Sequence, residues 1–242
     1  MTALLTVERV SKRFRGLGAV QDVSFAVNGG EIFSVIGPNG AGKTTLFNMI
    51  AGVLRPDEGA IAFDGHSIEG HTPDDICRRG IGRTFQLVRP FPALTVAENV
   101  MIGALLRRPN TEDAEVHASE VMRQLDLFDK RAMPASALTL PDRKRLEVAR
   151  ALATAPKLLL LDEVMAGLRP VETDRMVKIL QDINRSTGLT IVLIEHVMRA
   201  VMALARRVLV LHHGAVIAEG EPAAVVRDPA VVKSYLGTEA IG

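Results

Sequence analysis

The glycine-rich segment 37–44, Gly-Pro-Asn-Gly-Ala-Gly-Lys-Thr, has the spacing of a phosphate-binding loop. Apolar runs at 31–36 and 45–51 predict a strand before this loop and a helix after it. Glycines let the backbone fold tightly around phosphate groups, and the N–H groups at a helix N-terminus supply positive potential. We expect Lys43 to reach the β- and γ-phosphates and the Thr44 hydroxyl to ligate Mg²⁺. The predicted nucleotide-binding residues are Gly37, Pro38, Asn39, Gly40, Ala41, Gly42, Lys43, Thr44 and Thr45.

Two carboxylates follow another apolar run, Leu158–Leu161, as Asp162 and Glu163. If this run is a central parallel strand, Asp162 lies beside the phosphate loop and holds Mg²⁺, directly or through water. Glu163 would then orient or deprotonate an attacking water. These residues by themselves are equally consistent with a strand whose last residues turn into solvent. The phosphate loop elsewhere in the chain favours the catalytic interpretation.

Two further polar residues lie near predicted strands. His196 follows the apolar run 190–194 and could donate a hydrogen bond to a γ-phosphate, although a solvated or core histidine is commoner. Gln86 follows Arg83-Thr84-Phe85, and its amide could ligate Mg²⁺ or hold the attacking water. Spacing alone does not distinguish these roles of Gln86 from those of a surface glutamine.

The elements that must position these residues change in type along the chain. The first third is rich in short β-type runs, whereas the middle carries helix-start signals, including the capping box Thr95-x-x-Glu98 and the pair Thr72-Pro73. Buried strands return near the end of the chain. The predicted strands are 4–10, 23–27, 31–36, 60–63, 158–161 and 190–194, and the predicted helices include 112–128 and 170–186.

This order predicts an α/β fold of the phosphate-loop NTPase type, with a parallel central sheet, an N-terminal antiparallel β layer and an inserted helical subdomain. We expect residues 1–242 to form a single domain. Within it, residues 1–86 and 156–242 would form the nucleotide-binding core and residues 87–155 the helical subdomain.

Composition excludes several classes of function. Lys and Arg total 29 against 28 Asp and Glu. The net charge of +1 therefore leaves no excess of basic residues of the kind that binds nucleic acid. No apolar run approaches the ~18 residues of a membrane helix. The start of the chain carries Glu8 and Arg9, which argues against an export signal. The single cysteine, Cys77, excludes an internal disulfide and fits a reducing cytoplasm.

Together these motifs resemble the nucleotide-binding subunits of ABC transporters over essentially the whole chain. The resemblance identifies the segment 37–44 with the Walker A loop and Asp162 with the end of the Walker B strand. It implies an ATPase that uses ATP and Mg²⁺. The further roles that it implies are a catalytic glutamate at Glu163, a Q-loop glutamine at Gln86, a switch histidine at His196 and an adenine-stacking aromatic at Phe14.

Three longer stretches resemble more narrowly the ATPases of Liv-type importers for branched-chain amino acids: 80–86, 89–100 and 234–237. That family implies a bacterial uptake system with a second ABC ATPase subunit, transmembrane permease subunits and, indirectly, a solute-binding protein. The chain would lie peripherally on the cytoplasmic face of the inner membrane. Related importers for urea or amides share these motifs, so the transported solute is an expectation from the family.

The segment 138–143, Leu-Thr-Leu-Pro-Asp-Arg, departs from the family signature Leu-Ser-x-Gly-Gln-Gln, which contacts the γ-phosphate of ATP held by the partner subunit. Pro141 lacks a backbone N–H, and Asp142 would place a carboxylate near the incoming phosphate. With Thr139 as N-cap, the segment still predicts a sound helix start. Arg169 likewise replaces the usual Asn or Asp.

This departure leaves two hypotheses for a dimer of ATPase subunits. In the first, the Walker A loop of this chain forms the active site with an intact signature of the partner, and the chain's own signature serves a weak second site. In the second, the backbone groups of Leu140 and Arg143 suffice, and both sites work. A regulatory ATP-binding subunit with little turnover is a further alternative, although Glu163 argues against it.

Two other clusters are expected to carry no chemistry. His212-His213 stands before Gly214 between apolar runs and predicts a turn between strands rather than a metal site. The run Arg143-Lys144-Arg145 is expected to be a solvated helix face.

Overall fold

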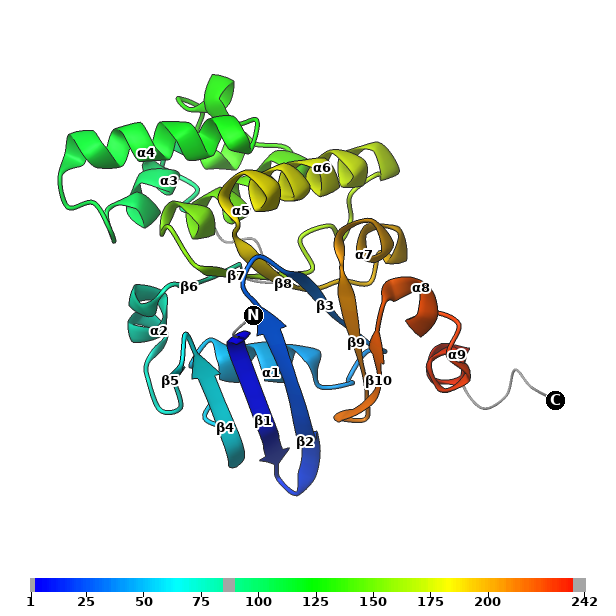
Figure 1. Cartoon of the computed structure of the whole chain (residues 1–242). Helices are drawn as coiled ribbons and strands as arrows, with labels where there is room; N and C mark the ends of the chain where they lie inside the picture. Colours follow the sequence, from blue (N-terminus) through cyan, green and yellow to red (C-terminus); the bar gives the residue numbers. More distant parts are fainter. Residues whose placement is uncertain (1–2, 85–89, 237–242) are drawn as a thin grey trace. The chain divides into compact units, whose positions relative to one another are not determined.

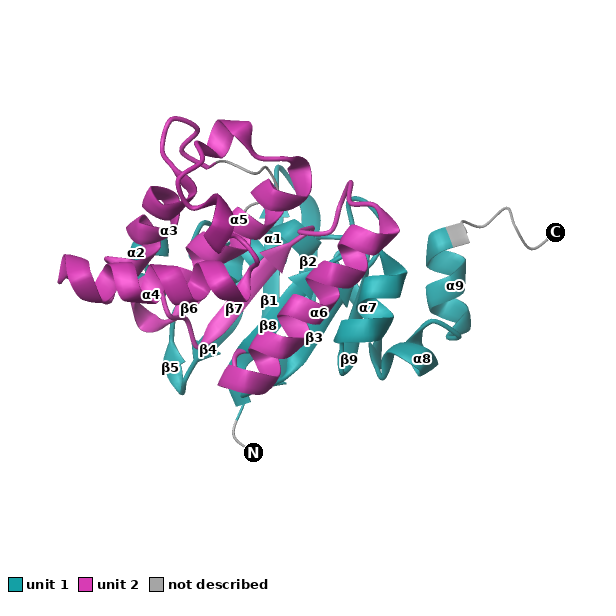
Figure 2. Cartoon of the chain, turned by 90° about the horizontal axis from the view of Figure 1, so that it is seen from above, with its two compact units in different colours: residues 1–76, 190–242 teal, residues 77–189 magenta. Residues whose placement is uncertain are grey.

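The computed structural model describes residues 3–84 and 90–236. Figure 2 shows the chain as two compact units, one formed by residues 1–76 and 190–242 and the other by residues 77–189. The predicted division into a core and a helical subdomain at 87–155 stays a prediction.

The first unit contains an antiparallel sheet with the strand order β2-β1-β4-β5 (Figure 1). Strands β1 and β2 each mix buried and exposed positions along their length. Val7 of β1 pairs with Phe25 of β2. Both strands are longer than their predicted apolar runs because the ladder continues through polar residues near the hairpin. The bounds are Ala3–Phe14 for β1, Leu17–Asn28 for β2, Glu58–Phe63 for β4 and His66–Ser67 for β5.

A second group of strands in the same unit leads into the phosphate loop. Strand β3 (Ile32–Ile36) lies between β8 (Thr190–Ile194) and β9 (Arg207–His212) and is parallel to both. Every residue of β3 and β8 is buried, as strands covered on both faces require. Strand β10 (Ala215–Gly220) returns antiparallel to β9. The helices here are α1 (Lys43–Ile50), α7 (Met198–Leu204), α8 (Pro222–Val225) and α9 (Pro229–Leu236).

The second unit is mainly helical and holds a parallel strand pair, in which Gly82 of β6 aligns with Leu159 of β7. Helices α3 and α5 pack closely, since a Cβ on Gly103 would lie 2.4 Å from the carbonyl oxygen of Arg150. The bounds are Ile81–Arg83 for β6, Leu158–Asp162 for β7, Val96–Ala104 for α3, Thr111–Gln124 for α4, Leu140–Ala153 for α5 and Pro170–Thr187 for α6. Helix α2 (Pro73–Arg79) precedes β6, and short 3₁₀ helices span Phe128–Lys130 and Ala135–Ala137.

Local signals placed the helix ends well. Thr95 forms the predicted capping box with Glu98, and Gly188 ends α6 at a φ of 69°. The prediction of one helix over 112–128 was wrong at its end, because α4 stops at Gln124. Phe128 instead lies between guanidinium groups, with Arg123 at 4.3 Å and Arg131 at 4.6 Å from the ring centre.

No helix among the described residues is long and apolar enough to span a membrane.

Candidate functional site

The phosphate loop begins where β3 ends, and glycine is required at both of its ends. Gly37 has a φ of 146°, and a Cβ there would lie 2.1 Å from the carbonyl oxygen of Leu211. Gly42, the N-cap of α1, has a φ of 101°, and its Cβ would lie 2.3 Å from the carbonyl oxygen of Ala19. Any side chain would therefore clash with backbone at either position.

The cationic centre of the loop is Lys43, whose side chain is buried. Its ammonium donates to the carbonyl oxygens of Gly37 at 2.7 Å and Pro38 at 2.9 Å. No side chain caps the N-terminus of α1, and its first turn contains no acidic residue. The N–H groups that start α1 and the ammonium of Lys43 therefore form a positive cradle suited to phosphate.

Two other predicted residues belong to the same unit. Phe14 ends β1 with 43% of its surface exposed, so its ring is accessible for stacking on a base. His196 lies two residues beyond the end of β8 and is exposed.

In the second unit, strand β7 ends in Asp162, and this carboxylate does not turn into solvent. Asp162 is 1% exposed, its backbone N–H donates to the Thr84 hydroxyl at 3.0 Å, and its Oδ2 lies 3.5 Å from the guanidinium of Arg83. Burial raises the pKa of Asp162, and the charge of Arg83 opposes that shift only in part. The solvent-facing alternative for Asp162 was wrong.

The buried carboxylate of Asp162 is suited to a cation. Its Oδ1 has no hydrogen-bond partner among the described residues. A buried oxygen without a donor fits Mg²⁺, which prefers oxygen ligands and usually retains several waters. No group of three or more His, Cys, Asp or Glu side chains is arranged to hold a metal within residues 3–84 and 90–236.

Glu163 follows in a backbone conformation that is uncommon for a residue with a side chain. Its φ is 52°, and its carbonyl oxygen accepts a hydrogen bond from Lys144 at 3.0 Å. Left-handed conformations of this kind are costly and concentrate at functional sites. The side chain of Glu163 is half-buried, so solvent can reach it.

The segment 138–143 forms the predicted helix start, with Thr139 as the N-cap of α5. The carboxylate of Asp142 reaches back to the helix start and is neutralised there, while its position relative to a partner's phosphate stays a prediction. Asp142 is 2% exposed and is bonded to Lys130, to Arg145 and, at 2.8 Å, to the Thr139 hydroxyl. Burial favours a higher pKa for Asp142, but these three hydrogen bonds outweigh it and hold the pKa below its ordinary value.

The prediction of a solvated face for Arg143-Lys144-Arg145 was also wrong, because the last two side chains are buried. Lys144 donates to the carbonyl oxygen of Glu163, and Arg145 pairs with Asp142 and approaches Asp126 at 3.6 Å. These acceptors inside the unit offset part of the free-energy cost of removing the two charged groups from water.

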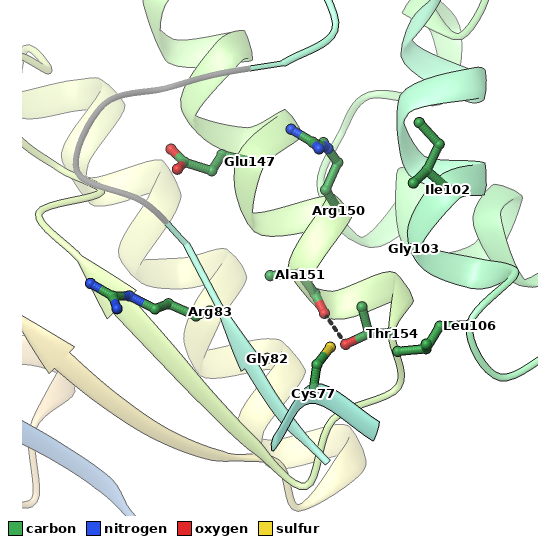
Figure 3. A pocket seen from close by; sticks show the side chains of 10 residues that line it. All are labelled: Cys77, Gly82, Arg83, Ile102, Gly103, Leu106, Glu147, Arg150, Ala151 and Thr154. Carbon is green, nitrogen blue, oxygen red and sulfur yellow. Dashed lines mark hydrogen bonds between the residues drawn. The ribbon is translucent and has the colours of Figure 1, made fainter. Parts of the chain in front are cut away.

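A cavity of about 290 Å³ lies between α3, α5, β6 and the end of α2 (Figure 3). Figure 3 shows the Cys77 thiol near Thr154 and Leu106, while Glu147 and Arg150 project from α5. Ile102 lines the cavity and is 44% exposed, and Leu105, next in sequence to the lining residue Leu106, is 42% exposed. These two side chains form an exposed apolar rim at this part of the unit.

Gln86 lies outside the described residues. The sequence reasoning missed Arg83 and Lys144, which contact Asp162 and the backbone of Glu163. Arg83 belongs to the stretch 80–86 and Lys144 to the run 143–145, but no spacing signal connects either residue with Asp162 or Glu163.

The family model described as ABC transporter matches residues 20–166. The chain is 36% identical to the branched-chain amino acid transport ATP-binding protein BraF of Pseudomonas aeruginosa over 97% of this chain and 98% of the relative. It is 37% identical to LivG of Escherichia coli K12 at the same coverage. It is also 37% identical, over 98% of both chains, to the lipopolysaccharide export ATP-binding protein LptB of Haemophilus influenzae. The chain belongs to the ABC transporter ATP-binding family.

Structural comparison agrees with this assignment. A nucleotide-free ATP-binding cassette from an ABC transporter superposes with a TM-score of 0.89 at 32% identity, covering 98% of this chain and all of the other. The ADP conformation of the cassette MJ1267 gives the same values. The predicted α/β fold class is therefore confirmed, and the chain is an ATPase subunit of a transporter. A second family model, described as Branched-chain amino acid ATP-binding cassette transporter, matches residues 215–241.

Proposed function

We propose that this chain hydrolyses ATP to power an importer for branched-chain or other hydrophobic amino acids. The observation that carries the proposal is the near-full-length similarity to BraF and LivG, together with the family match over residues 215–241. The equal identity to LptB keeps lipopolysaccharide export as a competing transport function, and importers of urea or amides are a further alternative.

Roles of individual residues follow from the chemistry of the two strand ends. The N–H groups of residues 37–45 and the ammonium of Lys43 bind the phosphates of ATP, and Phe14 stacks on adenine. Thr44, Gln86 and Asp162 hold Mg²⁺, which when bound neutralises charge on the phosphates. Glu163 orients or deprotonates the attacking water, and His196 donates toward the γ-phosphate.

The partners that we propose are a second ABC ATPase subunit and transmembrane permease subunits, served by an external solute-binding protein. The chain would lie peripherally on the cytoplasmic face of the inner membrane. The apolar rim at Ile102 and Leu105 is the surface that we assign to the permease, because exposed apolar patches of this kind mark contact sites.

The segment 138–143 supports an asymmetric arrangement of the ATPase pair. Leu140 is 41% exposed, Pro141 offers no backbone N–H, and Thr139 is engaged with Asp142. Few donors remain at this helix start for a phosphate on the partner subunit. We therefore propose that the productive site uses the Walker motifs of this chain, and that the site served by its signature turns over weakly. A regulatory subunit with little turnover is the second candidate, favoured by the same segment.

The experiment is to measure ATP hydrolysis by this chain with Mg²⁺, alone and with its genomic-neighbour ATPase and membrane subunits. Glu163→Gln should lower turnover of the assembled complex by about 100-fold or more, because a general base is lost. The matched control is Glu115→Gln on the exposed side of α4, which should leave turnover unchanged. Equal activity of Glu163→Gln and wild type would overturn the assigned role of Glu163.

Transport in proteoliposomes tests the solute. ATP-dependent uptake of leucine, and not of urea, is the expected result when a matching solute-binding protein is supplied. Hydrolysis absent in every combination, with ATP still bound, would favour the regulatory subunit instead.

A further inference from the structure

The phosphate loop and the strand before it contact two segments that lie far away in sequence and contain none of the assigned site residues. One is the β9–β10 hairpin, from Leu211 at the end of β9 to Gly214 in the turn, and the other is α9 near the end of the described chain. Both belong to the same compact unit as the loop. Neither segment has a role in the chemistry proposed above.

The β9–β10 turn is bonded directly to the loop. The backbone N–H of Gly214 donates to the carbonyl oxygen of Ala41 at 3.1 Å, inside the phosphate loop. Just before the turn, the carbonyl oxygen of Leu211 in β9 would lie 2.1 Å from a Cβ on Gly37. The hairpin is therefore in contact with the loop near both of its ends.

Gln21 of β2 in turn holds this turn in place. Its side-chain amide donates to the carbonyl oxygen of His213 at 2.7 Å, and its backbone N–H donates to the carbonyl oxygen of Gly214 at 2.8 Å. Gly214 has a φ of 83°, and a Cβ there would lie 2.9 Å from the carbonyl oxygen of Ala19. Strand β2, the phosphate loop and the β9–β10 turn thus meet at Gly214, where no room remains for a side chain.

Helix α9 packs on the strand that leads into the loop. Val231 of α9 lies in one buried cluster with Ile36, the last residue of β3, and with Val225.

A glycine-rich loop binds phosphate well only if its N–H groups already point inward, because ordering them on binding costs conformational entropy. We propose that Gln21 is a positioning residue for the phosphate loop and acts through the β9–β10 turn. It pre-organises the loop without touching the nucleotide. This inference rests on the proposed nucleotide-binding role of residues 37–45.

The test uses a variant that removes one polar group and keeps the length of the side chain. Gln21→Met loses the amide. Calorimetric titration of the full chain with ADP and, separately, with pyrophosphate should show dissociation constants about three- to tenfold higher for this variant, the effect of one hydrogen bond. Because the loop binds the phosphates and not the base, the dissociation constants of both ligands should rise by the same factor.

A matched control comes from the same strand. Leu17→Ala alters an exposed residue of β2 and should bind like wild type. Thermal unfolding of nucleotide-free Gln21→Met separates positioning from packing, since a merely structural role would lower the midpoint and leave both dissociation constants within twofold of wild type.

That last result would overturn the inference, and so would weaker binding of ADP with unchanged binding of pyrophosphate. A wild-type chain that bound neither ligand would overturn the proposed nucleotide site and the inference with it. A loss confined to Gln21→Met supports the inference and leaves the nucleotide site intact.

Discussion

At the residue scale, the carboxylate of Asp142 stabilises the start of α5 by neutralising two cations. It bonds Lys130 and Arg145 and closes a hydrogen-bonded pair with Thr139. Asp142→Asn would leave the buried Arg145 without its main counter-charge. We expect the free energy of unfolding at pH 7 to fall by about 2–3 kcal/mol in urea titrations. The control Asp129→Asn, at an exposed position, should change it by less than about 0.5 kcal/mol.

The same carboxylate predicts a dependence of stability on pH. The pKa of Asp142 is lower in the folded chain than its ordinary value, so its contribution is complete above the unfolded pKa of about 3.9. It is lost as pH falls below about 4, because the proton then binds the unfolded chain more readily. Wild type should therefore lose more stability than Asp142→Asn between about pH 5 and pH 2. Parallel pH curves for the two proteins would contradict this account.

At the scale of elements, the packing of α3 on α5 depends on Gly103. A Cβ at this position would lie 2.4 Å from the Arg150 carbonyl oxygen and would force the helices apart. Gly103→Ala should cost about 1–3 kcal/mol of unfolding free energy in spite of the better helix propensity of alanine. Gly29→Ala is the matched control, because nothing lies within 4 Å of its added methyl group. Equal stability of both variants would show that α3 can shift freely.

A substitution on the exposed face of α3 tests the proposed contact with the permease. Ile102→Asp should weaken assembly with the membrane subunits by roughly tenfold or more, since a buried apolar contact is replaced by a charge. Val116→Asp changes an exposed apolar residue of α4 that does not line the cavity beside α3. Co-purification with the membrane subunits measures the difference. Assembly of Ile102→Asp at the level of Val116→Asp would remove this face from the interface.

At the scale of the whole molecule, asymmetry between two ATP sites is the central prediction. If the segment 138–143 serves a weak site, Glu163→Gln should abolish most hydrolysis by the complex. Substitution of the partner subunit's catalytic glutamate should lower turnover by less than about twofold, because that site contributes little. A large loss on changing the partner's glutamate alone would contradict the asymmetric dimer.

Sequence by itself determined the features that local chemistry defines. The loop at 37–44, the carboxylates after a buried strand and the capping box at Thr95 depend on residues within a few positions of one another, and the fold class followed from their order. The helix predicted over 112–128 was wrong at its end, since periodicity does not show where α4 stops.

Tertiary structure decided which way the charged side chains face. The carboxylate of Asp142 and the cations Lys144 and Arg145 are buried because their partners come from other elements. The contact between Gly214 and Ala41 depends on a turn at the far end of the chain. No local pattern encodes such pairings, because the free energy of a buried charge depends on groups that only folding brings within hydrogen-bond distance.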